Sequence, residues 1–578
     1  MNNDASDWPA QPWILAVFLA LAGYVYFLIF DRISFASDEV DQMVAAATFV
    51  AVGSMTFVFS VQKNKWFWAC VFSILWGVII AAALYSNIAS NAHKFEFNFT
   101  ILAALLSAAI ALPLFQTARD YNWLKLPYPT VHRYAWNDFL GGATALLFVG
   151  ISYALLFLIS SLFKLIGLNF LERLFDFEWF FIVFNGAAFG GSLGVLKQNS
   201  KIVSSIQNLV MTVLSILSPL LCFGLIVFLF SLPFTGLHSL WDATRNTSAI
   251  LITCAFGSVL LSNAILRDDV GQESSNRILR FSALGLALCI LPLAIISIIS
   301  VNIRVSQHGL SPDRIWAMII VTVAIAYGLA YLLAVLRKRK SWMSGIRSSN
   351  IVLAMTLCLA ALFLAAPILN FNKISTEDQV ARLEDGRTTA DDFDFAALAF
   401  DFGPEGRAFL KKQQQSDDPT MVKGAKTALE ATSRWNAKNE IHTQAQVTTI
   451  ENNIQVLPVQ IDIPEKLKNI IIANGSCIKG YCTLIWLETS DIAQLITSSC
   501  HNTHTNTKPG NCAPMVWALN RTENDWQINY NSLRVRNPDI KKQGYDMFWD
   551  DLAKGQIEYR SVERQQLFIG GRPIGQPY

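Results

Sequence analysis

Charged residues are scarce in this 578-residue chain, since Asp, Glu, Lys and Arg together make up 15% of it. Soluble domains carry about 25% charged residues, so the composition excludes an ordinary soluble protein. The charge is also nearly balanced, with 45 basic and 43 acidic residues and a formal net charge of +2. This balance does not indicate nucleic acid or a polyanion as a partner.

Several signatures of catalytic and cofactor sites are also absent. The chain has no GxxxxGK[ST] phosphate loop, no HExxH helix and no DxDxDG calcium loop. No cysteine pair has the CxxCH spacing of covalently attached haem. We therefore predict no cofactor and no catalytic residue, and we favour a non-enzymatic protein.

Apolar runs of bilayer length fill the first 370 residues. The run from Leu209 to Leu232 contains no Asp, Glu, Lys, Arg or His, and about 20 apolar residues are enough for a helix to cross the hydrocarbon core. The first run is interpreted as a retained helix, because Phe30-Asp31-Arg32 follows it in place of a small-residue cleavage site. The predicted spans are eleven, at about residues 13–30, 43–60, 66–84, 97–115, 140–162, 179–196, 209–232, 247–266, 279–301, 315–336 and 351–368.

Lys and Arg are concentrated in the loops that follow even-numbered spans, which carry fifteen of them against seven in the other loops. Because basic residues are retained on the cytoplasmic side, the N-terminus is predicted to be cytoplasmic. With eleven spans, the C-terminal tail is then periplasmic. The strongest topology determinants are Arg337, Lys338, Arg339 and Lys340. A specific site for anionic lipid is the alternative role for this cluster.

The composition changes after residue 370. Helix starts are predicted at Ser375–Asp378, Thr389–Asp392 and Gly403–Glu405, and an amphipathic helix after Pro419, whose apolar face is expected to pack within its own domain. From about residue 441 short β-type runs alternate with polar turns. The predicted fold is therefore mainly α: a polytopic transmembrane helix bundle (1–370), a helical membrane-proximal neck (371–436) and a small β-rich periplasmic domain (437–578).

Nine cysteines form two groups, of which five lie inside apolar runs. Four others cluster in the polar tail, where an oxidising compartment favours two disulfides. A zinc site with nearby histidines and free thiols are the alternatives. The spacing does not choose among the three possible connectivities. The disulfide candidates are Cys477, Cys482, Cys500 and Cys512.

The spans contain few strongly polar residues. Asn185 and Asn263 are expected to form hydrogen bonds between helices, with substrate binding as the alternative. Gly186, Gly190 and Gly194 recur at a spacing of four, which favours close packing of two helices. A flexible, ligand-lined segment is the other interpretation of these glycines.

Three segments resemble a known family: LPFTGLHSLW (232–241), HGLSPDRIWA (308–317) and DQVARLEDGRTTADDFDFAALAFDFGPEGRAFL (378–410). They are similar to bacterial polytopic inner-membrane proteins grouped as domain of unknown function 4153. The resemblance implies an integral membrane protein of the cell envelope and brings no established activity or catalytic residue. The loops after spans seven and nine lie on the same side as the tail, and their interaction candidates are His238, Trp241, Asp313 and Arg314.

These patterns predict a multi-pass protein of the bacterial inner membrane that displays a periplasmic domain as a sensor, binding protein or scaffold. Its expected partners are membrane lipids and an envelope protein, without nucleic acid. A permease or a transporter of lipids or envelope precursors is the alternative, for which an internal hydrophilic cavity is the distinguishing feature. A membrane-embedded enzyme is a third hypothesis and requires convergent polar groups from the loops after spans seven and nine.

Overall fold

The chain divides into two compact units in the computed structural model. The first comprises Met1–Phe393 with Asp401–Phe409, and the second comprises Asp394–Phe400 with Leu410–Tyr578. Each unit is described separately below. The structure describes all residues except 1–7, 34–39, 92–98, 122–124, 237–246, 270, 272, 275, 367, 391, 439–453, 458–461, 475–481, 487–490, 499–513, 522–525, 535–544, 558–566, 570–571 and 575–578.

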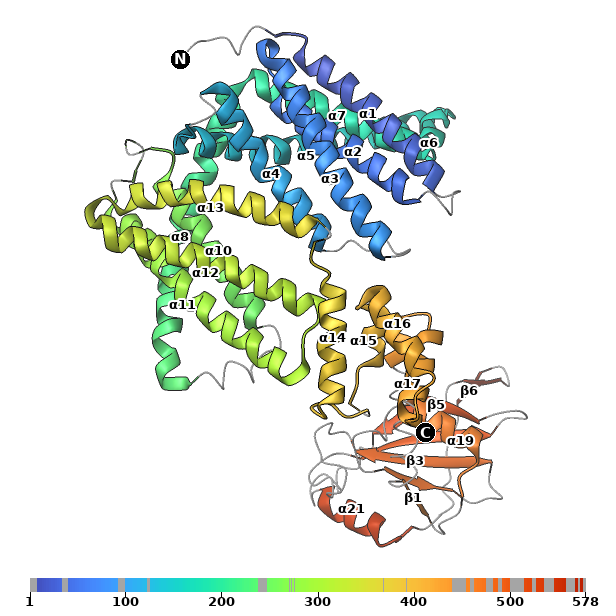
Figure 1. Ribbon diagram of the computed structural model, residues 1–578. Helices are drawn as coiled ribbons and strands as arrows, with labels where there is room; N and C mark the ends of the chain where they lie inside the picture. Colours follow the sequence, from blue (N-terminus) through green and yellow to red (C-terminus); the bar gives the residue numbers. More distant parts are fainter. Residues whose placement is uncertain are drawn as a thin grey trace. The chain divides into compact units, whose positions relative to one another are not determined.

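The first unit is a helix bundle (Figure 1). Within the described residues, eleven helices are long and apolar enough to cross a membrane, which confirms the predicted number and fold class. They are α1 (Gln11–Ile33), α2 (Val40–Ser60), α3 (Trp66–Asn91), α4 (Phe99–Asp120), α5 (Tyr128–Leu165), α7 (Glu178–Gln198), α8 (Ser200–Thr235), α10 (Thr247–Leu266), α11 (Arg277–His308), α12 (Pro312–Lys338) and α13 (Trp342–Ala365). Short connecting elements are η1 (Lys63–Lys65), α6 (Phe170–Phe175) and η3 (Arg339–Ser341).

Two of these helices extend well beyond the predicted spans. α5 begins at Tyr128, twelve residues before the predicted fifth span, and α8 begins at Ser200 rather than near residue 209. At about 1.5 Å per residue, the 36 residues of α8 measure about 54 Å, more than a hydrocarbon core of about 30 Å. Hydropathy therefore locates the lipid-crossing part and misses the polar helical turns beyond it.

The bundle has two main apolar cores. One lies among α1, α2, α5 and α7 and includes the buried residues Leu15, Val58 and Leu193. The other lies among α8, α10, α11, α12 and α13 and is centred on Ile290 and Leu293. Because each helix buries only part of its surface in these cores, the rest remains available to lipid.

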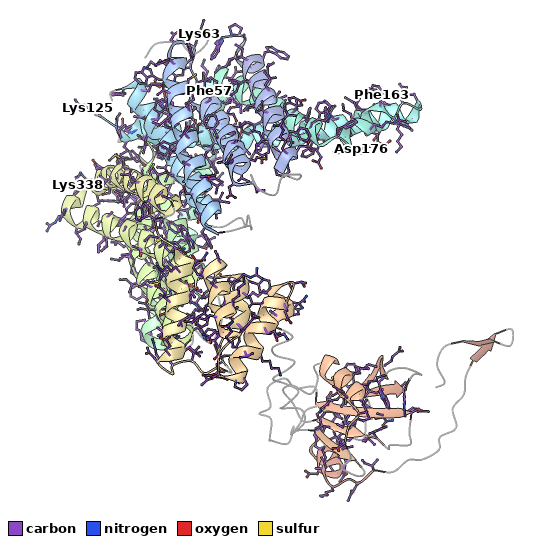
Figure 2. The ribbon with its side chains drawn as sticks, turned by 45° about the vertical axis from the view of Figure 1, so that its right-hand side comes forward. Phe57, Lys63, Lys125, Phe163, Asp176 and Lys338 are labelled. Carbon is purple, nitrogen blue, oxygen red and sulfur yellow. The ribbon has the colours of Figure 1, made fainter. Side chains whose placement is uncertain are left out.

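Large apolar side chains cover the outside of the bundle (Figure 2). On α8, Leu220, Phe223 and Phe230 are 73%, 69% and 72% exposed. Phe163 and Asp176 mark the tip of the helical hairpin formed by α5, α6 and α7 (Figure 2). Such an apolar exterior is stable in hydrocarbon, where no hydrophobic penalty opposes exposure.

Four shorter helices follow the bundle: α14 (Phe371–Glu384), α15 (Phe395–Phe400), α16 (Gly403–Gln413) and α17 (Pro419–Glu430). The helix start predicted at Ser375 is wrong, because α14 begins at Phe371. The Asn370 side chain caps it by accepting a hydrogen bond from the Lys373 amide at 2.9 Å. Ser375 is instead fully buried inside the helix.

The start predicted at Thr389–Asp392 is also displaced. α15 begins at Phe395, and Asp394 accepts a hydrogen bond from the Ala397 amide at 2.9 Å. The starts at Gly403 and Pro419 are confirmed. Asp418 caps α17 by accepting from the Thr420 amide at 2.8 Å.

The second unit contains a five-stranded sheet in the order β1-β2-β3-β4-β5. β1 and β2 are parallel, and the other neighbouring strands are antiparallel. β6 and β7 form a separate antiparallel pair. The elements are β1 (Ile454–Leu457), α19 (Glu465–Asn474), β2 (Cys482–Ile485), β3 (Ile492–Ser498), β4 (Pro514–Arg521), β5 (Trp526–Arg534), α21 (Tyr545–Ala553), β6 (Leu567–Ile569) and β7 (Arg572–Ile574).

A helix covers each face of this sheet. Leu484 on β2 packs in a cluster with Leu467 of α19. The next residue, Ile485, belongs to a second cluster that contains Trp549 of α21. Since successive side chains of a strand point to opposite faces, α19 and α21 lie on opposite sides of the sheet. The predicted β-rich domain is therefore a three-layer α/β/α unit in its described part.

Candidate functional site

The C-terminal ends of the second, fourth, sixth, eighth and tenth membrane helices lie at one end of the first unit. These helices are α2, α4, α7, α10 and α12. Gln62, just after α2, donates from Nε2 to Asp120 Oδ2 at the end of α4, at 3.0 Å. Gln198, the last residue of α7, donates to the Trp8 carbonyl at 2.6 Å. These hydrogen bonds place the ends of α2, α4 and α7 and the chain before α1 together.

A second set of contacts adds the ends of α10 and the starts of α5 and α13. The Arg347 guanidinium on α13 lies 2.9 Å from Glu273 and donates to the Leu266 carbonyl at 2.5 Å. His132 Nδ1 on α5 lies 2.6 Å from Asp268 Oδ1. We call this side of the bundle, made by the described residues within 8–11, 58–65, 116–141, 193–203, 262–280 and 337–350, the basic end.

The predicted topology determinants lie at the basic end. Arg337 and Lys338 end α12, and Arg339 and Lys340 belong to the single turn η3. Arg337, Lys338 and Arg339 are exposed. They line no pocket described below.

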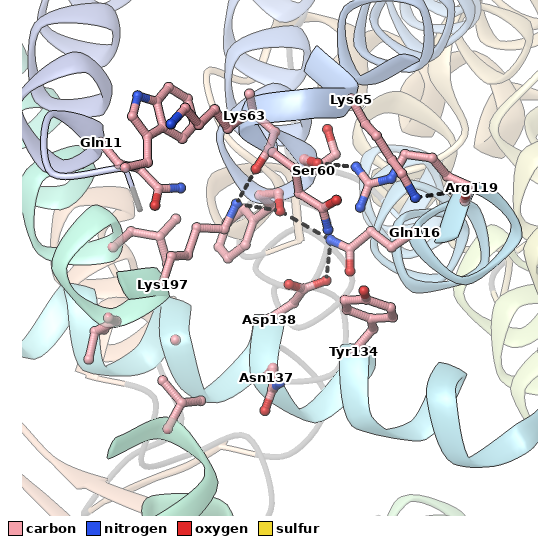
Figure 3. A pocket seen from close by; sticks show the side chains of 18 of the residues that line it. Gln11, Ser60, Lys63, Lys65, Gln116, Arg119, Tyr134, Asn137, Asp138 and Lys197 are labelled. Carbon is pink, nitrogen blue, oxygen red and sulfur yellow. Dashed lines mark hydrogen bonds between the residues drawn. The ribbon is translucent and has the colours of Figure 1, made fainter. Parts of the chain in front are cut away.

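A pocket of about 440 Å³ lies at the basic end (Figure 3). Its walls come from the chain before α1, the turn between α2 and α3, and helices α4, α5, α7 and α8. Both apolar and polar side chains line the pocket. Its polar lining residues are Gln11, Ser60, Gln62, Lys63, Asn64, Lys65, Gln116, Arg119, Tyr134, Asn137, Asp138 and Lys197.

Most of the buried cations in this pocket stabilise the C-terminus of α2. The last carbonyls of a helix have no partner within the helix, so they need donors from elsewhere. Arg119 donates from Nη1 to the Ser60 carbonyl, and Gln116 donates to the Phe59 carbonyl at 3.2 Å. Lys197 Nζ donates at 2.7, 2.8 and 3.2 Å to the carbonyls of Val58, Phe59 and Val61.

Two acidic residues bind the side chains around the pocket. Asp120 lies 2.8 Å from Arg119 and 3.0 Å from Lys65, and Tyr134 donates to it as well. Asp138 accepts a hydrogen bond from Gln116 Nε2 at 3.0 Å. These pairings fix the side chains around the pocket and leave its shape independent of any occupant.

Two acceptors in the pocket wall lack a donor in the described part of the chain. They are Gln116 Oε1 and Asn137 Oδ1, both inaccessible to solvent. Gln116 is 2% exposed, and its amide nitrogen is used by two acceptors. Since buried polar groups are nearly always paired, these two oxygens are exceptions within the described pocket wall.

A separate polar cluster joins four helices near the basic end. Asn263 on α10 donates to the Tyr331 hydroxyl of α12 at 2.7 Å and accepts from Asn350 of α13 at 2.7 Å. Tyr128 of α5 donates to the same Asn263 oxygen at 3.3 Å. Asn263 thus connects helices, as does Asn185, whose amide donates to the Tyr153 hydroxyl at 3.0 Å.

The predicted glycine face of α7 lies against α1. A Cβ at Gly186 or Gly190 would overlap the backbone carbonyl of Leu19 or Leu15. A Cβ at Gly194 would lie 2.5 Å from the Cα of Pro12. The three positions therefore allow the α1 and α7 backbones to approach closely.

Residues 190–194 read Gly-Gly-Ser-Leu-Gly, which has the letters of the GxSxG nucleophile elbow. An elbow places its serine on a sharp turn between a strand and a helix. Ser192 lies in the middle of α7, is buried, and donates from Oγ to the Phe189 carbonyl at 3.0 Å. The structure therefore gives this serine no nucleophilic role.

At the other end of the bundle, α14 binds the turn between α11 and α12. Gln379 donates from Nε2 to the His308 and Leu310 carbonyls, at 2.9 Å each. Asp378 accepts a hydrogen bond from the Leu310 amide at 2.6 Å. Arg382 donates to the Gln307 carbonyl at 3.0 Å. We call this set of contacts the α14 joint.

The turn itself is shaped for this joint. Gly309 has φ +72°, and an added Cβ would lie 2.7 Å from Arg382 Cδ and 2.8 Å from Asp378 Oδ2. Arg314 closes the turn by donating to the Gly309 carbonyl at 2.6 Å. Asp313 is exposed in the first turn of α12.

The remaining predicted site residues belong neither to the pocket nor to the α14 joint. His238 and Trp241 lie outside the described residues, as do Cys477, Cys500 and Cys512. Cys482 begins β2 and is 3% exposed. The disulfide pairing therefore stays a prediction. In the part of the chain that the structure describes, no three His, Cys, Asp or Glu side chains are grouped to hold a metal ion.

The bundle, its lipid-facing exterior and its polar end define a multi-pass membrane protein. Residues 44–408 match the family model described as domain of unknown function (DUF4153). The match covers more than half of the chain, so the protein belongs to this family, as the sequence resemblance predicted. No curated protein and no solved structure matches the chain.

Two of the segments that carry that resemblance meet in space. Residues 308–317 contain the turn and the start of α12, and residues 378–410 begin within α14. Their contacts form the α14 joint. The pocket, in contrast, has no compact sequence pattern, because Gln116, Asp138 and Lys197 are far apart in the chain.

Proposed function

We propose that the protein is a non-enzymatic anchor and binding protein of the bacterial inner membrane. Its basic end faces the cytoplasm, and its second unit is displayed in the periplasm, where it binds a partner of the cell envelope. The observation that carries this proposal is the separation of the basic end from the α14 joint at opposite ends of the membrane helices.

The contacts among the helix ends support this sidedness. Five groups of basic residues follow even-numbered helices, and hydrogen bonds such as Lys197 to the end of α2 keep those ends on one side. Basic loops are retained in the cytoplasm during insertion. The chain leaves the bundle at Ala365, the end of the eleventh helix, and therefore on the other side.

The α14 joint supports an anchoring role. Three polar side chains of α14 bind backbone groups of one turn between membrane helices, so the chain leaves the bundle in a fixed direction. Backbone partners make this attachment independent of a particular side chain on the turn.

Fusion of topology reporters tests the proposed orientation. A periplasm-dependent phosphatase and a cytoplasm-dependent fluorescent protein are placed after Gln198, after Thr235 and after Tyr578. We expect fluorescence only at the first position and phosphatase activity at the other two. Fluorescence together with an inactive phosphatase at Tyr578 would overturn the proposal.

A permease is the second candidate, because the bundle contains a pocket with polar lining residues at its basic end. A transporter needs a polar path across the bundle, with a site near the middle of the membrane. The pocket residues lie instead at helix ends, and Lys197 and Arg119 are occupied by backbone carbonyls. Substrate uptake by proteoliposomes that depends on Asn137 would favour the permease over the anchor.

A further inference from the structure

We propose that the pocket at the basic end binds a polyol phosphate, with hydroxyl groups inside the pocket and the phosphate at its mouth. The glycerol phosphate headgroup of an anionic lipid has this chemistry, as does free glycerol phosphate. This site lies at the end of the bundle away from the α14 joint, and it does not depend on the function proposed for the displayed unit.

The inner wall requires hydrogen-bond donors. Gln116 is 98% buried, and its amide nitrogen donates both to the Phe59 carbonyl at 3.2 Å and to Asp138 Oδ2 at 3.0 Å. These two bonds fix the amide orientation, so Oε1 is left without a donor among the described residues (Figure 3). Asn137 Oδ1 is a second buried acceptor without a partner among the described residues.

The charge of the pocket selects hydroxyl donors over ammonium donors. Four cationic side chains line it, Lys63, Lys65, Arg119 and Lys197, against the carboxylate of Asp138 in the lining and that of Asp120, which pairs with Lys65 and Arg119. An ammonium group would be repelled by this excess of positive charge. A hydroxyl group donates equally well to an amide oxygen and carries no charge.

The mouth is suited to the phosphate. Lys63 and Lys65 belong to η1, the turn between α2 and α3, and line the pocket. Lys63 is exposed, and the Lys65 side chain is 42% exposed with Asp120 at 3.0 Å. Lysine ammonium groups are common phosphate ligands. The volume of about 440 Å³ lies in the range of small-molecule sites, about 300–1,000 Å³.

Binding to the full-length protein in detergent tests this proposal. Native mass spectrometry measures retention of phosphatidylglycerol, phosphatidylethanolamine and phosphatidylcholine at equal concentrations. We expect preferential retention of phosphatidylglycerol. Competition with soluble glycerol phosphate then separates the sources: displacement of the lipid assigns the site to the free compound, and persistence of the lipid assigns it to the headgroup.

Two variants of pocket residues and one control variant test whether binding depends on the pocket. Asn137→Leu removes an acceptor and should weaken binding about fivefold, while leaving thermal stability equal or higher because a buried unpaired oxygen is lost. Lys63→Gln, at an exposed position, should weaken binding about tenfold and reduce its salt dependence. Lys201→Gln is the control, since Lys201 is exposed at the same end and does not line the pocket.

Two results would overturn the proposal. One is equal retention of phosphatidylglycerol and phosphatidylcholine together with no binding of glycerol phosphate. The other is binding by Asn137→Leu and Lys63→Gln that equals that of Lys201→Gln. Because Lys63 is exposed, its variant is expected to fold, so loss of structure cannot account for a change in its affinity.

Discussion

Replacement of Gly190 by alanine tests the close packing of α1 and α7. The added Cβ would overlap the Leu15 carbonyl oxygen and lie 2.7 Å from the carbonyl carbon. Carbon atoms in ordinary contact are about 3.5–4.0 Å apart, so the helices must separate by about 1 Å. The neighbouring atoms are backbone, and they can move only with the whole of α1.

The two contributions to stability have opposite signs. Overpacking of this kind costs about 1–3 kcal/mol, whereas alanine favours a helix over glycine by about 0.5–1 kcal/mol. We therefore expect Gly190→Ala to lower the free energy of unfolding by about 1–2 kcal/mol. The ratio of folded to unfolded protein then falls by about fivefold to thirtyfold.

Two glycines provide matched controls. An added Cβ at Gly191, the next residue of α7, would lie 3.5 Å from the Ala16 Cβ and 4.0 Å from the Pro12 carbonyl oxygen, and both are ordinary contacts. Gly224 on α8 has no atom within 4 Å of an added Cβ. Both alanine variants should be as stable as the wild type or up to about 1 kcal/mol more stable.

Reversible denaturation of the detergent-solubilised protein, followed by tryptophan fluorescence, measures these differences. The order of stability should be Gly224→Ala and Gly191→Ala above wild type, and Gly190→Ala below it. If Gly190→Ala unfolds at the same denaturant concentration as Gly191→Ala, the close approach of α1 and α7 is refuted.

Three other predictions follow from the structure. Lys197→Met leaves carbonyls at the end of α2 without a donor and should lower the free energy of unfolding by about 3 kcal/mol, whereas Lys201→Met should have little effect in the same denaturation assay. Asp378→Ala should increase amide hydrogen exchange in residues 306–310, and Asp385→Ala, in an exposed ion pair, should not. Mass mapping of the exported, non-reduced protein should find two disulfides among Cys477, Cys482, Cys500 and Cys512. Four free thiols at these positions would contradict the prediction.

Hydropathy was sufficient to predict the number of membrane helices, because a run such as Leu209–Leu232 cannot be stable in water or in lipid except as a buried or spanning helix. It underestimated α5, whose first turns contain Tyr134 and Asp138. These residues are helical because they pack in the polar pocket at the basic end. A scale that measures transfer into lipid has no means to recognise that environment.

Sequence signals for a helix start were reliable where only one nearby side chain could cap the N-terminus. Ser311-Pro312-Asp313 has the residue types of a helix start, and Ser311 caps α12 by accepting a hydrogen bond from the Arg314 amide at 3.4 Å. The start of α14 was misplaced because Ser375 and Asn370 are both suitable caps, and burial of Ser375 decides between them. The helices α19 and α21 were missed, although Leu467 and Ile471 have the spacing of a helical face.

Of the candidate site, the sequence predicted only that its lysines lie on one side of the membrane. Lys63, Lys65 and Lys197 were recognised as basic residues of one side of the membrane. Their roles differ, since Lys197 binds the end of α2 while Lys63 stays exposed. The sequence does not show which helix ends meet. The unpaired acceptors Gln116 Oε1 and Asn137 Oδ1 could therefore be identified only in the structure.

The cap of α2 also constrains the order in which the membrane unit can assemble. α2 is made early, but the donors for its last carbonyls come from Gln116 and Arg119 on α4 and from Lys197 on α7. A nascent chain that ends before residue 197 leaves part of that terminus without its protein partners. The N-terminal half therefore completes its folding only after α7 has entered the bilayer, and the five membrane helices made before it must be held in the membrane until then.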